Sequence, residues 1–212
     1  MEPIEEGYYY HIYNRGADRN NLFWSEEDYR EFIKKYVYYL YPCVQTFAWC
    51  LLSNHFHALI RVRTVQEQSN LYQHRKKLFL AGKYHGSQDP LIKPFIASKQ
   101  VSHLINSYTR FINKKRDRSG TLIEGPFKRK KIIDKINFIN LTCYIHRNPV
   151  HHGIVKKYSE YRYSSFHDFM NNRKSFTEIS EVFESFGGRD NFIRAHEEFA
   201  SNTVEGTAFF LE

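Results

Sequence analysis

The chain has 212 residues, of which 42% are hydrophobic and 17% aromatic, and it carries a formal net charge of +8. The length predicts one globular domain with room for an extension, and the positive charge favours a polyanion partner, although many small proteins are basic without one. No apolar run is long enough to cross a bilayer and no signal peptide is recognisable, so we expect a cytoplasmic protein rather than a membrane protein.

The first third of the chain alternates between strand and helix patterns. Aromatic and β-branched residues predict a strand over residues 7–15, which ends in a turn at Gly16. Ser25 is a good N-cap and three acidic residues follow it, which predicts a helix that stops before Pro42. Two strands follow, over residues 44–52 and 55–62, joined by a tight turn.

The middle of the chain holds two further helices and one strand. Residues 64–96 are polar and mostly aperiodic, so we interpret them as an inserted linker or mobile loop with helical fragments. A helix is predicted over residues 96–115, and a strand over residues 121–133 with a break at Gly125-Pro126. The third helix is capped by Asp134. It should end at Arg147 or Asn148, because a residue that precedes proline is pushed out of the helical region.

This order of elements is the split β-α-β arrangement of a ferredoxin-like fold. We therefore predict an α+β protein with an antiparallel sheet, helices on one face of that sheet, and the other face left for a ligand. Residues 1–170 form this domain, and residues 171–212 form an acidic helical extension that is mobile at its end. Cys43, Cys50 and Cys143 are odd in number and form no C-x-x-C pair, which is typical of reduced core thiols.

A His-x-His pattern lies in the strand at residues 55–62. Side chains alternate along a strand, so His55 and His57 share one face and Phe56 lies on the other. Two neighbouring imidazoles can share one divalent cation through neutral ring nitrogens. The alternative is a pair of polar side chains that face solvent. The strongly apolar flanks indicate a central strand, on which a polar pair usually has a function.

A basic cluster lies between residues 110 and 131, opposed only by Asp117 and Glu124. Its nine members are Arg110, Lys114, Lys115, Arg116, Arg118, Lys128, Arg129, Lys130 and Lys131. Lysine and arginine contacts to phosphates provide affinity that does not depend on sequence but depends on salt. Nearby aromatic residues can stack on unpaired bases. The alternative is a solvated charged turn, but a metal-competent histidine pair in the same chain favours nucleic acid.

Cutting DNA also needs a nucleophile, and the chain has 16 tyrosines. Tyr144 stands out because Asn148 follows it by four residues, which puts both side chains on one helical face. The amide oxygen of Asn148 could then ligate the metal beside which Tyr144 attacks. Tyr108 falls on the apolar stripe of its own helix and is expected in the core.

Five segments together carry a family resemblance. They are Tyr10-His11-Ile12-Tyr13-Asn14-Arg15-Gly16, Asn54-His55-Phe56-His57, Gly125-Pro126-Phe127-Lys128, Tyr144-Ile145-His146-Arg147-Asn148-Pro149-Val150 and Tyr161-Arg162-Tyr163-Ser164-Ser165-Phe166. In this order they resemble the REP-associated tyrosine transposases, a branch of the single-tyrosine HUH endonuclease superfamily. The chain departs from that pattern in its longer linker and in Ser53, where relatives often have proline.

The resemblance implies specific roles. His55 and His57 would hold Mg²⁺ or Mn²⁺, Asn148 would be a third ligand, Tyr144 would be the nucleophile, and Arg15 would join the DNA-binding residues. The implied reaction nicks and rejoins single-stranded DNA beside a hairpin, in palindromic repeats, through a 5′-phosphotyrosine. Relatives act as monomers or homodimers. Two alternatives stay open, which are a hairpin-binding protein without activity and a metal-dependent nuclease that uses water.

Overall fold

A four-stranded antiparallel sheet with the strand order β2-β3-β1-β4 organises the chain. The computed structural model describes residues 4–80, 93–171 and 175–199. The strands are β1 (Tyr9–Arg15), β2 (Val44–Leu51), β3 (His55–Val62) and β4 (Lys128–Ile132). β3 and β1 occupy the centre, so each pairs with a strand on both sides. The predicted α+β fold with a ferredoxin-like antiparallel sheet is confirmed.

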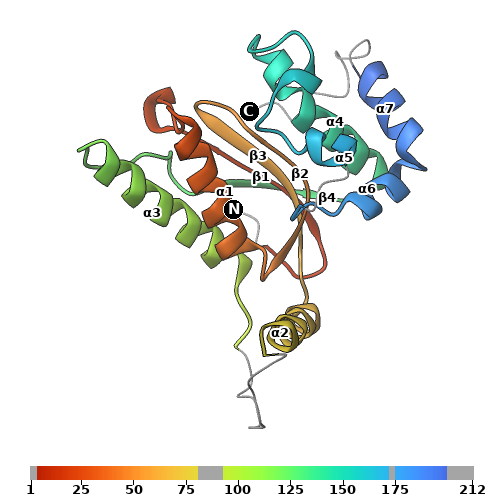
Figure 1. Ribbon diagram of the computed structural model, residues 1–212, viewed down its shortest axis with the longest axis horizontal. Helices are drawn as coiled ribbons and strands as arrows, with labels where there is room; N and C mark the ends of the chain where they lie inside the picture. The colour runs from red at the N-terminus through yellow and green to blue at the C-terminus, as the bar shows by residue number, and fades with distance from the viewer. Residues whose placement is uncertain (1–3, 81–92, 172–174, 200–212) are drawn as a thin grey trace.

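Helices cover both faces of this sheet (Figure 1). The α-helices are α1 (Glu26–Leu40), α2 (Val65–Leu80), α3 (Ala97–Lys115), α4 (Lys135–His151), α5 (Phe166–Asn171), α6 (Ile179–Phe186) and α7 (Arg189–Glu198). Two short 3₁₀-helices, η1 (Ala17–Arg19) and η2 (Tyr158–Glu160), complete the described elements. None of the described helices is long and apolar enough to span a membrane.

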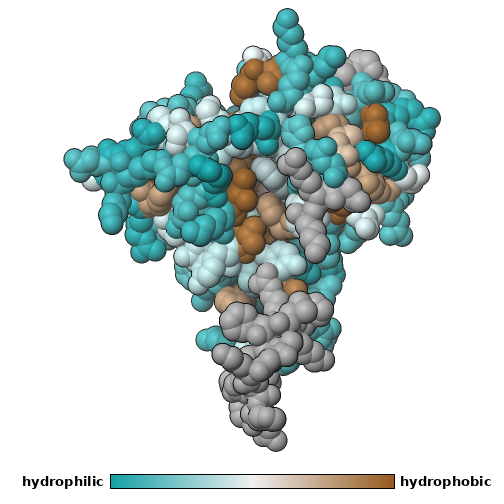
Figure 2. Space-filling view, in the orientation of Figure 1, coloured by the Kyte–Doolittle hydropathy of each residue, from teal (hydrophilic) through white to brown (hydrophobic). Residues whose placement is uncertain are grey.

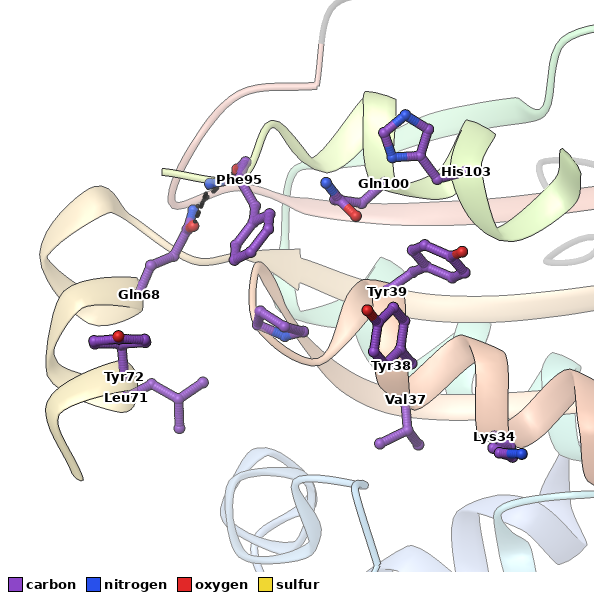
Figure 3. A pocket seen from close by; sticks show the side chains of 11 residues that line it. Lys34, Val37, Tyr38, Tyr39, Gln68, Leu71, Tyr72, Phe95, Gln100 and His103 are labelled. Atoms are coloured by element: carbon purple, nitrogen blue, oxygen red, sulfur yellow. Dashed lines mark hydrogen bonds between the residues drawn. The ribbon is translucent and has the colours of Figure 1, made fainter. Parts of the chain in front are cut away.

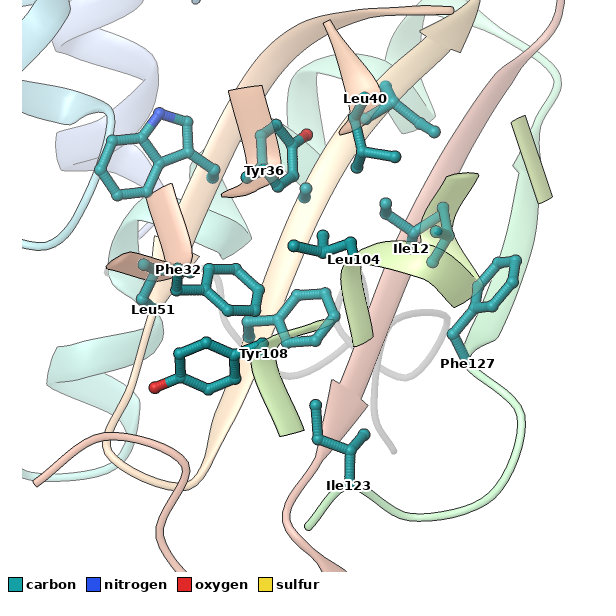
Figure 4. Packing of buried hydrophobic residues seen from close by; sticks show 14 of the residues in the cluster. Ile12, Phe32, Tyr36, Leu40, Leu51, Leu104, Tyr108, Ile123 and Phe127 are labelled. Atoms are coloured by element: carbon teal, nitrogen blue, oxygen red, sulfur yellow. The ribbon is translucent and has the colours of Figure 1, made fainter. Parts of the chain in front are cut away.

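The first core lies between the sheet and the helices α1 and α3. The ring of Phe32 from α1 meets the ring of Tyr108 from α3 edge to face at 5.0 Å, and lies 5.2 Å from the ring of Phe56 on β3. Figure 4 shows Phe32 and Tyr108 next to each other, with Leu104 between Phe32 and Ile12 of β1. All five side chains are buried. Burial of each large apolar side chain stabilises the fold by roughly 1.5–3 kcal/mol.

The second core lies on the opposite face, where α4 to α7 pack. It contains Phe47 of β2, Leu59 of β3, Leu141 of α4 and Phe192 of α7, all fully buried. The prediction that helices cover one face and leave the other open for a ligand is therefore wrong in this respect. The physical reason is the near-continuous apolar run of β2 and β3. It places apolar side chains on both faces of the sheet, and both faces must then be covered.

The helices on either side of the predicted boundary at residue 170 share this second core, since α6 and α7 pack with α4. The C-terminal helices were predicted, whereas the boundary itself stays a prediction. The end of the 171–212 extension was predicted to be mobile, and residues 200–212 lie outside the described residues. Figure 2 shows hydrophobic residues gathered centrally between the α3 side and the α4–α7 side, and hydrophilic residues over the outer surfaces. All three cysteines are buried free thiols.

Two element boundaries differ from the prediction. β4 begins at Lys128 rather than residue 121, because Gly125 has a φ of +28° and Pro126 has no N–H, so the chain turns there before pairing with β1. Helix α4 does not stop at Asn148 but continues through Pro149 to His151. A proline in the last turn removes one backbone donor while the carbonyl of Asn148 still accepts from His152 N at 3.0 Å.

The segment predicted as an inserted linker begins as helix α2, which Gln68 holds against the start of α3. The Gln68 Oε1 accepts from Phe95 N at 2.9 Å, and its Nε2 donates to Phe95 O at 3.2 Å (Figure 3). A cavity of about 720 Å³ lies beside this contact, with Tyr38 of α1, Tyr72 of α2 and His103 of α3 in its lining. Residues 81–92, which belong to the predicted loop, lie outside the described residues.

Buried histidines link the C-terminal helices to the sheet. His196 Nδ1 lies 2.7 Å from Phe192 O, so it donates, and His196 Nε2 then accepts from His146 Nδ1 at 2.8 Å. His146 Nε2 in turn accepts from Ser165 Oγ at 2.8 Å, and Ser165 accepts from the backbone N–H of Trp49 on β2 at 2.9 Å. The neutral rings thus have a fixed proton order, and His146 fastens α4 both to α7 and, through Ser165, to the edge strand β2.

The hydrogen bonds of the buried histidines His146 and His196 predict a specific loss of stability in acid. Burial lowers the pKa of His196 from 6.5 to about 4 and the pKa of His146 well below 6.5. Their contribution is complete above pH 6.5 and is lost as the pH falls toward 4, because the unfolded chain binds these protons first. We expect the free energy of unfolding in urea to be flat from pH 8 to 7 and to fall below 6.5, with His196 alone accounting for about 3 kcal/mol in the limit.

The matched control compares two substitutions. His196→Gln should reduce the slope of unfolding free energy against pH between 6.5 and 4.5, whereas His103→Gln, at an exposed position, should leave it unchanged. A wild-type profile that stays flat down to pH 4.5, or equal slopes in the two variants, would contradict the assignment.

Candidate active site

The predicted histidine pair lies on the face of β3 that is turned to α4. Phe56 packs in the first core, while Leu59, two positions after His57 along the strand, packs in the second. This placement matches the alternation predicted from the sequence. The imidazole rings of His55 and His57 are 5.1 Å apart at 90°.

His57 is fully buried and contacts a third histidine, His11, on the neighbouring strand β1. His57 Nδ1 and His11 Nε2 are 2.9 Å apart, so one ring donates an N–H to the other. Burial lowers the pKa of His57 well below 6.5. Burial, together with the charge of Lys130, lowers the pKa of His11 to about 3. Both rings are therefore neutral at ordinary pH and share one N–H between the facing nitrogens.

His55 lies between two side-chain amides. Its Nδ1 is 2.7 Å from Asn54 Oδ1, and its Nε2 is 3.1 Å from Asn148 Oδ1. Burial lowers the pKa of His55, against the contact with Asn148 that raises it, so the ring is neutral. A neutral imidazole has one N–H and cannot donate to both oxygens. With the proton on Nδ1, the lone pair of Nε2 faces the oxygen of Asn148.

Two arrangements resolve this conflict. A half-turn of the Asn148 amide brings its Nδ2 to His55 as a donor, and this nitrogen has no hydrogen-bond partner among the described residues. A divalent cation that accepts both lone pairs also resolves it. Two ligand atoms on adjacent octahedral positions around Mg²⁺ are about 3 Å apart, which agrees with the 3.1 Å between Nε2 and Oδ1.

The donor set limits which metal fits. Two neutral imidazoles and one amide oxygen suit Mn²⁺ better than Mg²⁺, which prefers oxygen ligands. Within residues 4–80, 93–171 and 175–199, no three His, Cys, Asp or Glu side chains gather in a way that could hold a metal. The remaining ligands would therefore come from water or from a phosphate. The residues present fit a divalent cation that is completed by its substrate.

Helix α4 brings the predicted nucleophile to the same place. The ring of Tyr144 lies 5.7 Å from the ring of His57 and 6.4 Å from the ring of His11, edge-on in both cases. Asn148, one turn later, reaches His55. Tyr144 is 6% exposed and Asn148 is fully buried. The four residues predicted as metal ligands and nucleophile therefore converge, although they come from positions about ninety residues apart.

Tyr108, the rival tyrosine of the sequence analysis, lies elsewhere. It is fully buried in the first core, on the other face of the sheet, and its hydroxyl donates to Leu22 O at 2.8 Å. Burial raises the pKa of Tyr108 far above its usual range. It is a core residue.

Three residues at the site were not assigned from the sequence. His11 touches His57, Tyr13 stacks on His11 at 4.6 Å, and the exposed ring of His152 lies 4.7 Å from the ring of His55. The alternation of β1 placed His11 and Tyr13 on one face, but their pairing with β3 depends on register. His152 was missed because the helix was expected to end before it.

A loop braces the turn that precedes His55. Gly16 N donates to Asn54 O at 2.8 Å, and the backbone N–H groups of Leu22 and Phe23 both donate to Ser53 O, at 2.6 and 2.9 Å. A Cβ on Gly16 would lie 1.9 Å from the carbonyl oxygen of Asn20, so only glycine fits there. The chain after β1 thus fixes the entry into β3.

Comparison with known proteins bears on this arrangement. No protein-family model and no curated protein matches the sequence. Among solved structures, the chain is similar to a REP-associated tyrosine transposase bound to a REP hairpin, with a TM-score of 0.56 and 17% identity over 86% of this chain and 91% of that one. The chain has the fold of that transposase. The resemblance drawn from the sequence motifs is confirmed at the level of the fold.

A second solved structure is a bacterial tRNA(His) guanylyltransferase-like protein in complex with GTP. The TM-score is 0.40 and the identity 10%, over 71% of this chain and 68% of that one. This likeness is too low to support an argument.

Within this fold, the nine predicted basic residues do not form one surface. Lys128 and Lys130 of β4 pair with Tyr13 and His11 of β1, and lie on the face of the candidate site. Arg129 and Lys131 alternate to the other face, where Arg129 lies over the ring of Phe127 and Lys131 bonds Glu5 at 2.7 Å.

The basic residues of α3 and the loop after it have structural partners of their own. Lys115 bonds the fully buried carboxylate of Asp28 at 2.6 Å, and Arg116 lies 3.6 Å from that carboxylate. Arg118 donates to Asn113 Oδ1 at 2.6 Å, whereas Arg110 and Lys114 are exposed. Arg15, directly across from His55, bonds Glu124 at 2.7 Å.

This division predicts unequal roles in DNA binding. Lys128→Ala with Lys130→Ala should reduce the slope of log affinity against log salt for single-stranded DNA by roughly one to one and a half units, since each lost phosphate contact removes about 0.7. Arg129→Ala with Lys131→Ala is the matched control on the same strand, and its slope should change little. Fluorescence anisotropy over a salt series measures both. An equal loss in the control would show that DNA does not follow the face of the candidate site.

Proposed function

We propose that the protein is a metal-dependent endonuclease and transposase that nicks and rejoins single-stranded DNA near a hairpin. The observation that carries the proposal is the meeting of two independent sequence patterns. Tyr144 and Asn148, one turn apart on α4, face His57 and His55, which are adjacent on one face of β3. A packing role alone does not account for four polar side chains gathered in an apolar core, because burying polar groups costs free energy.

The partner follows from the charge and from the fold. The chain carries a net charge of +8, and Arg15, Lys128 and Lys130 border the candidate site. The transposase of the same fold was solved bound to a REP hairpin. We therefore propose a single-stranded or hairpin DNA partner, with palindromic repeats as its source and either a monomer or a homodimer as the active form.

The proposed ligands are His55, His57 and Asn148, which would hold Mn²⁺ or Mg²⁺. Once bound, such an ion supplies positive charge that polarises the scissile phosphate and stabilises the charge that develops on it. The bonds that form and break are those between Tyr144 and the DNA. Arg15, Lys128 and Lys130 bind neighbouring phosphates and orient the strand.

The nicking step forms one bond and breaks another. Tyr144 loses its phenolic proton to solvent, and its oxygen forms a bond to the phosphorus. The bond from phosphorus to the 3′-oxygen breaks, and this oxygen takes up a proton and leaves as a free 3′-hydroxyl. The other strand end stays on Tyr144 as a 5′-phosphotyrosine. Attack by a 3′-hydroxyl on that link reverses the step and rejoins DNA. Because only 6% of Tyr144 is exposed, the reaction requires a shift of α4 or of the side chain when DNA binds.

The test is the covalent adduct. Tyr144→Phe removes one oxygen and keeps the ring between the histidines, so we expect a folded protein that binds single-stranded DNA but forms no adduct that survives denaturing electrophoresis. Tyr13→Phe and Tyr108→Phe are the controls, and both should form the adduct with Mn²⁺ at a rate close to that of the wild type.

The outcomes also separate the alternatives. An adduct with the Tyr144→Phe protein would contradict the assignment, and mapping of the linked peptide would show which tyrosine acts. Nicking without any adduct in the wild type would indicate a nuclease that uses water. Hairpin binding without nicking would indicate a DNA-binding protein that lacks activity.

A further inference from the structure

The contact between His11 and His57 has no part in the chemistry described above. We propose that His11 is a positioning residue that holds His57 in the tautomer with its proton on Nδ1, so that the lone pair of Nε2 is available to a divalent cation. This inference rests on the proposed function and assigns to β1 a share in building the metal site.

The proton count at this contact allows two arrangements. His11 Nε2 and His57 Nδ1 are 2.9 Å apart, and both rings are buried, with 1% and 0% of their surface exposed. Each ring, when neutral, carries one N–H. If His57 Nδ1 carries the shared proton, its Nε2 is a lone pair. If His11 Nε2 carries it, His57 must hold its own proton on Nε2, which then cannot bind a metal.

The neighbouring histidine favours the first arrangement. Both nitrogens of His55 face amide oxygens, but Nδ1 makes the shorter contact, 2.7 Å to Asn54 Oδ1 against 3.1 Å from Nε2 to Asn148 Oδ1, so we assign the ring proton to Nδ1. Its Nε2 then faces Asn148 Oδ1. With the same polarity at His57, both rings offer Nε2 on the site and are held through Nδ1. Partners of this kind orient metal-binding histidines and fix their tautomer.

The position of His11 is rigid enough for this role. It lies on a central strand and pairs with Leu59 on one side and Lys130 on the other. Its ring stacks on Tyr13 at 4.6 Å and 26°, and it lies nearly parallel to the ring of His57 at 20°. A neutral imidazole also accepts a hydrogen bond without placing a negative charge in an apolar core, where an unpaired carboxylate would be costly.

Two substitutions separate this role from simple packing. His11→Phe keeps a flat ring on Tyr13 but removes the acceptor, whereas His11→Gln keeps an acceptor at a similar reach. We expect the Kd for Mn²⁺ alone, measured by titration calorimetry, to rise by roughly 10- to 100-fold in His11→Phe and by no more than about threefold in His11→Gln. If His11 were needed only for packing, His11→Gln would raise the Kd for Mn²⁺ more than His11→Phe.

A spectroscopic measurement on the wild type makes the test independent of both variants and of activity. Nitrogen-15 shifts of the histidine side chains in the protein before metal addition report which nitrogen of His57 carries the proton. We expect protonated Nδ1, and protonated Nε2 would overturn the inference. Equal Mn²⁺ affinity in the wild type and His11→Phe would overturn it as well. If the wild type binds no Mn²⁺, the proposed metal chemistry fails, and the tautomer of His57 alone then supports or overturns the role of His11.

Discussion

The alternation of side chains along β3 is the constraint on which the candidate site depends. This strand is covered on both faces, so Phe56 enters the core under α1 while His55 and His57 face α4. A slip of the pairing register by one residue would put the imidazoles among the side chains of the first core and turn Phe56 toward Asn148. Apolar packing on the two faces therefore does more than stabilise the fold, because it fixes which side of the sheet receives the histidines. The brace from Gly16 and from the loop after it fixes where β3 begins.

Helix α4 forms the second part of the candidate site, and it makes contacts on two opposite sides. Tyr144 and Asn148 face the sheet, whereas His146, between them in sequence, bonds His196 and Ser165 on the other side of the helix. These contacts set the rotation of the helix about its axis, and thereby the place of the two residues that face the histidine pair. Burial keeps all of these imidazoles neutral, which is the state that a metal ligand and a hydrogen-bond acceptor both require.

The local parts of this arrangement could be predicted from the sequence, since periodicity predicts which residues share a face of one strand or one helix. The faces of β3 and of α4 followed from it, and so did the core position of Tyr108. The features that could not be predicted from the sequence depend on tertiary contacts. The pairing of His11 with His57 needs the register of β1 against β3, and the second core needs the return of the C-terminal helices to the sheet.

The passage of α4 through Pro149 was missed because propensity disfavours it, although the last turn of a helix tolerates a missing donor. Alternation along β4 separates Lys128 and Lys130 from Arg129 and Lys131, but which pair lies on the face of the candidate site depends on the register of β4 against β1.

The most direct measurement of the central claim, that α4 and β3 together build one metal site, is an anomalous difference map from crystals of the protein soaked in Mn²⁺. The account predicts a single strong peak bounded by His55 Nε2, His57 Nε2 and Asn148 Oδ1, on the side of β3 that faces Tyr144. A peak at other residues, or none in this place at a concentration of Mn²⁺ that supports nicking, would contradict it.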